Sequence, residues 1–95
     1  MGIIAGMKIS IKAYALRCPV TGLVRYVGAA ANPQTRLNLH VYGYSANVGI
    51  SPVSLWIHYL RQQIGRMPAL EILEIVESKR HALDAEKRWI NKMID

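Results

Sequence analysis

The chain has 95 residues, of which 52% are hydrophobic, and a formal net charge of +6. This length allows one folded domain, residues 1–95, and the hydrophobic fraction is too high for a disordered chain. No apolar run approaches the roughly 20 residues that span a bilayer, so we expect no membrane insertion. Cys18 is the single cysteine and cannot close an intrachain disulfide, and the sequence shows no secretory leader, so we expect a cytoplasmic protein.

The charges are distributed unevenly along the sequence. All six acidic residues lie between Glu71 and Asp95, whereas residues 1–70 carry seven Lys and Arg residues and no acid. A field of one sign attracts polyanions, which predicts contact with nucleic acid. The alternative is a basic, solvated surface that binds no particular partner.

The first elements predicted are two antiparallel strands. Residues 8–18 alternate between apolar and polar side chains, which predicts a strand with one polar face that includes Lys12 and Tyr14. A Pro-Val-Thr-Gly turn at 19–22 returns the chain into a second strand over 24–27. Whether Tyr14 and Tyr26 share a face depends on the register of this hairpin, which the sequence leaves open.

A helix is predicted directly after the second strand. Gly28 is expected to end the strand with a structural turn, because glycine adopts backbone conformations that other residues resist. Asn32 suits the N-cap of the helix and Pro33 its first position, so the helix should cover about residues 33–41.

This strand and helix hold the main candidate site. Arg36 and His40 are four residues apart and therefore share one helix face, next to the strand that carries Tyr26. A guanidinium can bind two phosphate oxygens, and a phenol and an imidazole can transfer protons, so the combination suits a phosphodiester. The alternative is an ordinary strand-to-helix connection whose Arg and His are merely solvated.

The middle of the chain predicts a loop, a helix and a strand. Residues 41–50 are rich in glycine and small polar residues, which is typical of a loop. Ser51 should cap a helix that ends at Gly65. Residues 67–76 favour a third strand, although two leucines in this segment also fit a helix. The apolar stripe of the Ser51-capped helix should face the core and consists of Val53, Trp56, Ile57, Leu60 and Ile64.

The last helix, capped by Ser78, carries an unexpected carboxylate. Glu86 falls in the middle of its apolar face, where burial of a charge is costly unless a cation or hydrogen-bond donors meet it. A structural ion pair and a metal ligand or general base are both open interpretations. The neighbours of Glu86 on this face are Ala82, Leu83, Trp89, Ile90 and Met93.

Together these residues resemble the GIY-YIG endonuclease family over about residues 9–92. The two tripeptides that name the family read Lys12-Ala13-Tyr14 and Tyr26-Val27-Gly28, so the tyrosines and the final glycine are kept. Arg36 stands at the position of the family's arginine, His40 at its His-or-Tyr position and Glu86 at its metal-binding glutamate.

The resemblance implies an α+β fold, with a three-stranded antiparallel sheet flanked by three helices, and metal-dependent hydrolysis of DNA. It assigns one Mg²⁺ or Mn²⁺ ion to Glu86 and the neutralisation of transition-state charge to Arg36. Tyr14, aided by Tyr26 or His40, would help to deprotonate the attacking water. All five side chains are expected to line one pocket on the sheet.

The departures from the family pattern define an alternative. Ala29-Ala30 replaces a polar or basic residue that often follows the second tripeptide, and the late asparagine has no counterpart. Lys12 is the expected replacement cation, and Lys12, Arg25 and Arg36 are the residues expected to bind single- or double-stranded DNA. The alternative is a weak or inactive module of this fold that binds nucleic acid or protein. Specificity would come from the module itself, a partner chain or self-association.

Overall fold

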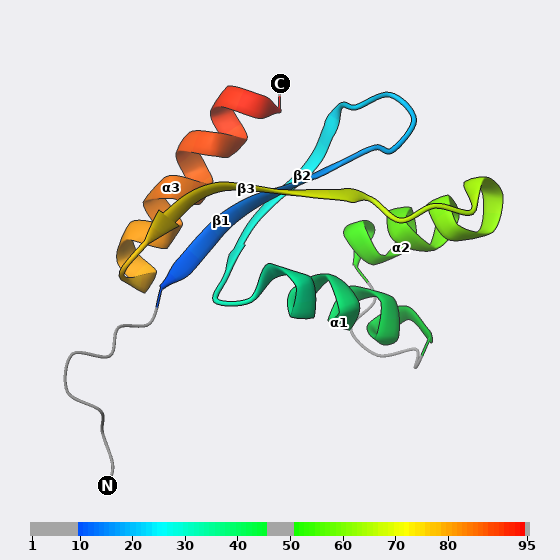
Figure 1. Ribbon diagram of the computed structural model, residues 1–95, viewed down its shortest axis with the longest axis horizontal. Coiled ribbons are helices and arrows are strands. Elements are labelled where there is room, and N and C mark those ends of the chain that lie inside the picture. Colours follow the sequence, from blue (N-terminus) through cyan, green and yellow to red (C-terminus); the bar gives the residue numbers. More distant parts are fainter. Residues whose placement is uncertain (1–9, 46–50, 95) are drawn as a thin grey trace, which may run out of the picture.

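The computed structural model describes residues 10–45 and 51–94 (Figure 1). It has a three-stranded antiparallel sheet and three α-helices, which confirms the predicted α+β fold. Lys8 and the end of the predicted loop, residues 46–50, lie outside the described residues. The elements in chain order are β1 (Ile11–Arg17), β2 (Val24–Ala30), α1 (Pro33–Ser45), α2 (Pro52–Tyr59), the π-helical turn η1 (Leu60–Ile64), β3 (Ala69–Val76) and α3 (Lys79–Met93).

The sheet has the strand order β2-β1-β3, so β1 is its central strand. β1 and β2 form the predicted hairpin, with Gly22 at a positive φ of 75° in the turn. The polar face predicted for β1 is wrong between Ala13 and Leu16, where all side chains are buried. The prediction failed because β3 pairs with β1 on its other edge and helices cover both faces of the sheet, as Figure 1 shows.

Each face of the sheet carries its own hydrophobic cluster. On one face, Tyr14 and Leu16 pack against α1 and α2, and on the other face Ala13 packs against α3. Since side chains alternate along a strand, neighbouring residues of β1 serve different clusters. The buried members of the first cluster are Tyr14, Leu16, Ala30, Leu37 and Ile57, and those of the second are Ala13, Val76, Ala82 and Ala85.

The helices begin at the three predicted caps. The side-chain oxygens of Asn32, Ser51 and Ser78 each accept a hydrogen bond from the backbone N–H three residues later, at 3.2, 3.3 and 3.2 Å. α1 continues to Ser45, so the loop predicted from residue 41 is wrong in its first part.

The end of the second helix departs from regular geometry. After Leu60 the chain widens into the π-helical turn η1, which Gly65 ends in the left-handed conformation. This wider turn moves the following residues around the helix axis, and Ile64 is 40% exposed instead of buried as predicted.

β3 and α3 are linked by a polar contact. The Glu74 carboxylate accepts hydrogen bonds from Arg88 Nη2 at 3.2 Å and from the indole N–H of Trp89 at 3.0 Å. Both bonds favour the charged form and lower the pKa of Glu74.

Within residues 10–45 and 51–94, no helix is both long and apolar enough to cross a membrane.

Candidate active site

Three aromatic rings from three elements lie in a row. The ring centroids of Tyr14 on β1 and Tyr26 on β2 are 6.1 Å apart, and His40 on α1 lies edge-on to Tyr26 at 5.9 Å. Tyr14 pairs with Gly28, two residues after Tyr26, so both tyrosines lie on one face of the sheet. This register answers the question that the sequence left open.

Gly28 is not the predicted turn. It lies inside β2, which continues to Ala30, and it does not adopt a left-handed conformation. A Cβ atom on Gly28 would lie 2.8 Å from Tyr26 Cε2 and 2.9 Å from the Tyr14 hydroxyl oxygen. Glycine is therefore required here because the two phenol rings occupy the space of a side chain.

We expect Gly28→Ala to destabilise the fold by about 1–3 kcal/mol, because the added methyl group forces the rings of Tyr14 and Tyr26 to move. Chemical denaturation of the wild type and the variant measures this cost. Tyr26→Ala is the matched background, since it removes one of the two rings and should reduce the cost of the Gly28 substitution. Equal unfolding free energies for wild type and Gly28→Ala would contradict the assignment.

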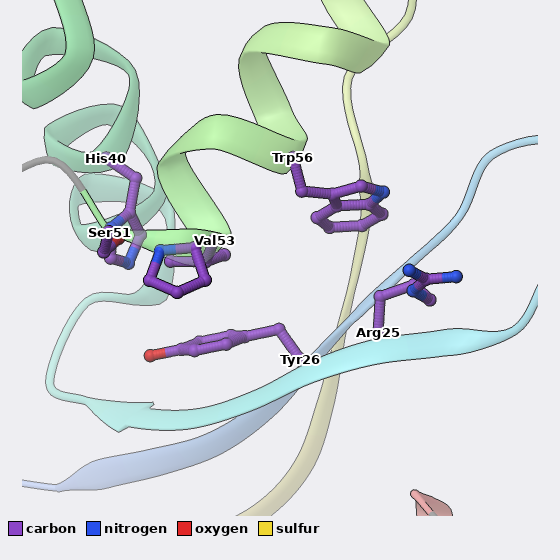
Figure 2. A pocket seen from close by; sticks show the side chains of 7 residues that line it. Arg25, Tyr26, His40, Ser51, Val53 and Trp56 are labelled. Carbon is purple, nitrogen blue, oxygen red and sulfur yellow. The ribbon is translucent and has the colours of Figure 1, made fainter.

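Tyr26 and His40 line a pocket of about 450 Å³ between β2 and α2, hereafter the aromatic pocket (Figure 2). Nε2 of His40 is buried and has no hydrogen-bond partner in the described part of the chain. Burial, and then the positive charge of Arg36, lower the pKa of His40. His40 is therefore neutral near pH 7 and can accept a proton. The lining residues are Arg25, Tyr26, His40, Ser51, Pro52, Val53 and Trp56.

Arg36 and Glu86 line a second pocket, of about 370 Å³, hereafter the charged pocket. The two residues come from helices on opposite faces of the sheet. They share a pocket because β2 is an edge strand and the small residues 29–31 at its end leave space around it. The lining residues are Ile11, Ala29, Ala30, Ala31, Arg36, Lys79, Ala82, Leu83 and Glu86.

Glu86 lies at the margin of the buried face of α3, not in its middle as predicted. The buried residues of this helix are Ala82 and Ala85, whereas Leu83 is 60% and Ile90 37% exposed. Glu86 itself is half-buried and makes no ion pair with any residue in the described ranges. The structural ion pair left open by the sequence is thus not present among these residues.

Tyr14 is buried and lines neither of the two pockets. Burial raises the pKa of the Tyr14 phenol, the adjacent Tyr26 raises it further, and the charge of Arg36 opposes the rise. The negative charge of Glu86 also raises this pKa, so Tyr14 is within electrostatic reach of residues from both pockets. Four of the five candidate residues therefore line two pockets, Tyr26 and His40 in one and Arg36 and Glu86 in the other, while Tyr14 is buried outside both.

Three further cations surround these pockets. Arg25 lines the aromatic pocket, and Lys12 Nζ donates a hydrogen bond of 3.1 Å to the carbonyl oxygen of Ala31, which lines the charged pocket. Lys79, in the first turn of α3, lines the charged pocket beside Arg36 and Glu86. Lys79 was not predicted as a site residue, although the Ser78 cap already placed it at the start of a helix.

The donor set of the charged pocket fits a hard divalent cation held by one protein ligand. Mg²⁺ is commonly bound by one or two carboxylates together with water and substrate phosphate oxygens. The Glu86 carboxylate is half-buried, free of an ion pair within the described ranges, and open to the pocket. No cluster of three or more His, Cys, Asp or Glu residues suited to a metal occurs in the described part of the chain.

Comparison with known proteins identifies one family. A family model described as the GIY-YIG catalytic domain matches residues 12–93, nearly the whole chain. No curated protein and no solved structure is similar enough to count as a match. The match includes Tyr14, Tyr26, Arg36, His40 and Glu86.

Proposed function

Because the chain belongs to the GIY-YIG catalytic-domain family, we propose that this protein is a metal-dependent endonuclease that hydrolyses DNA phosphodiester bonds. Membership of the family implies nuclease activity in general and a nucleic-acid substrate. The choice of DNA, the metal requirement and the residue roles belong to the proposal. The observation that supports it best is the charged pocket, in which a guanidinium and a carboxylate face the same space without pairing with each other.

Binding of the phosphodiester is assigned to the cations of the charged pocket. Arg36 is exposed and can bind two phosphate oxygens at once, while Lys79 and Lys12 add positive charge at the end of β2. Glu86 would hold the Mg²⁺ or Mn²⁺ ion, and such an ion, when bound, stabilises charge on the leaving oxygen. Arg36 neutralises the charge that develops on the phosphorus-bound oxygens in the transition state.

Proton transfer is assigned to the aromatic residues. His40 is the best proton acceptor for the attacking water, because its lowered pKa keeps it neutral near pH 7. The raised pKa of Tyr14 keeps its phenol protonated, which favours a hydrogen-bond donor over the base that the resemblance implies. Tyr26 lies between these two rings and positions them.

The cleavage rate should rise with pH through the pKa of His40, which lies below the ordinary value of 6.5, and level off by about pH 7. The sign follows from the base role, since His40 loses its proton as the pH rises and only the neutral form accepts one. His40→Ala should remove this acid limb and slow cleavage about 10²–10⁴-fold. His81→Ala is the control, because His81 is exposed on α3 outside both pockets. An unchanged pH profile in His40→Ala would remove His40 from the chemistry.

Incubation with labelled single- and double-stranded DNA, with Mg²⁺, Mn²⁺ or a chelator, tests the proposal directly. We expect cleavage products with a divalent ion and none with the chelator. Binding without cleavage under every condition would instead support the non-catalytic module, which Ala29 and Ala30 favour because they put no polar side chain at the end of β2.

A further inference from the structure

The aromatic pocket extends beyond the residues to which the proposed chemistry gives a role. Trp56 is half-buried and projects from α2 toward the side of β2 on which Arg25 lies (Figure 2). Neither the indole N–H of Trp56 nor the guanidinium of Arg25 makes a hydrogen bond or ion pair within the described ranges. An aromatic ring, an indole donor and a cation thus line the same pocket as Tyr26 and His40.

This combination recognises a flat aromatic heterocycle joined to a phosphate. Bases of single-stranded nucleic acid stack on aromatic side chains, and basic side chains contact the phosphates of the backbone. Guanidinium groups can also stack on base rings. A pocket volume of about 450 Å³ lies within the range of pockets that enclose small ligands. An aliphatic or purely anionic ligand could not stack on the indole ring of Trp56.

We infer that the aromatic pocket holds an unpaired nucleobase of the DNA strand that is cut, stacked on Trp56, with Arg25 at the adjoining phosphate. This inference rests on the proposed function, because it takes the strand in the charged pocket to continue past Tyr26 and His40. A base inside a duplex must leave its stack and its pairing partner before it can enter such a pocket. The protein should therefore bind single-stranded DNA more tightly than duplex DNA of the same sequence.

Binding measured by fluorescence anisotropy, in chelator so that no DNA is cut, tests the pocket. Trp56→Leu should weaken binding to a labelled single strand about tenfold, whereas Trp56→Phe keeps a stacking face and most of the affinity. Trp56→Leu and Trp56→Phe should bind duplex DNA with the same affinity. Tyr59→Leu is the matched control, because Tyr59 is an exposed aromatic residue on the same helix outside the pocket.

A strand of the same length with abasic sites in place of its bases gives a second readout. Wild type should bind this strand about tenfold more weakly than the normal strand, and Trp56→Leu should bind the two alike. If Trp56→Leu fails to fold, the comparison of the two strands with wild type alone decides. Equal affinity of wild type for normal and abasic strands, or of wild type and folded Trp56→Leu for the normal strand, would overturn the inference.

The two proposals fail in different ways. A protein that cuts no DNA but binds single strands through Trp56 loses the nuclease assignment and keeps the nucleobase pocket. A protein that cuts DNA and binds normal and abasic strands equally keeps the nuclease assignment and loses the pocket.

Discussion

Glu86→Gln should reduce DNA cleavage by about 10³-fold or more while leaving the fold intact. The substitution keeps the volume of the side chain and removes the charge that would hold the divalent ion, whose stabilisation of the transition state amounts to several kcal/mol. Asp84→Asn is the matched control, since it removes an exposed carboxylate of the same helix outside the charged pocket. Single-turnover cleavage by the three proteins measures the effect, and equal rates would take Glu86 out of the site.

The stability of the same variant separates a metal ligand from a structural residue. Glu86 makes no ion pair within the described ranges, so its neutralisation should leave the metal-free protein as stable as wild type or more stable. Mn²⁺ should raise the melting temperature of wild type and not that of Glu86→Gln. Loss of a buried pair would instead cost about 3–5 kcal/mol. Such a loss, or a wild-type melt that ignores millimolar metal, would assign Glu86 to the architecture.

Arg36→Gln should slow cleavage about 10²–10³-fold, because it removes the preorganised charge and the planar guanidinium that can donate two parallel hydrogen bonds to the phosphate. Arg36→Lys keeps the charge without the planar fork and should recover part of the rate. Arg36 is exposed and makes no ion pair within the described ranges, so neither change should alter stability by more than about 0.5 kcal/mol.

The pH profile adds an independent readout for Arg36. Its charge lowers the pKa of His40, so Arg36→Gln should move the acid limb of the cleavage profile to higher pH, whereas Arg36→Lys should move it less. Arg61→Gln is the control for the loss of one positive charge, since Arg61 is exposed in η1 and lines neither pocket. Equal rate losses in Arg36→Gln and Arg61→Gln would mean that Arg36 contributes only to the general field.

The features that the sequence predicted well are local in origin. The caps at Asn32, Ser51 and Ser78 are hydrogen bonds between residues three apart, and the hairpin turn depends on a few residues around Gly22. Such short-range interactions can be predicted from the residue types, because caps and turns depend on a few residues that are close together in the sequence.

The features that it missed depend on distant parts of the chain. Glycine is typical of turns, but at position 28 it is required because the rings of Tyr26 and of Tyr14, on another strand, occupy the space of a side chain. Likewise, the predicted polar face of β1 is absent between Ala13 and Leu16 because helices distant in the sequence cover both faces of the sheet. The individual site candidates came from local patterns and the resemblance, whereas Lys79 and Trp56 join the pockets only through tertiary packing.

From the central position of β1 in the sheet we expect a definite order of folding. The β1–β2 hairpin is local and can close within about 1–10 μs. β3 must instead bring Val76 to Ile11 and Ala69 to Arg17 across the intervening helices, which makes its loop closure entropically costly and slow. Until then one edge of β1 exposes unpaired backbone groups that can pair with another chain. Assembly should thus spread outward from the hairpin, and the charged pocket, which needs α3, should be completed last.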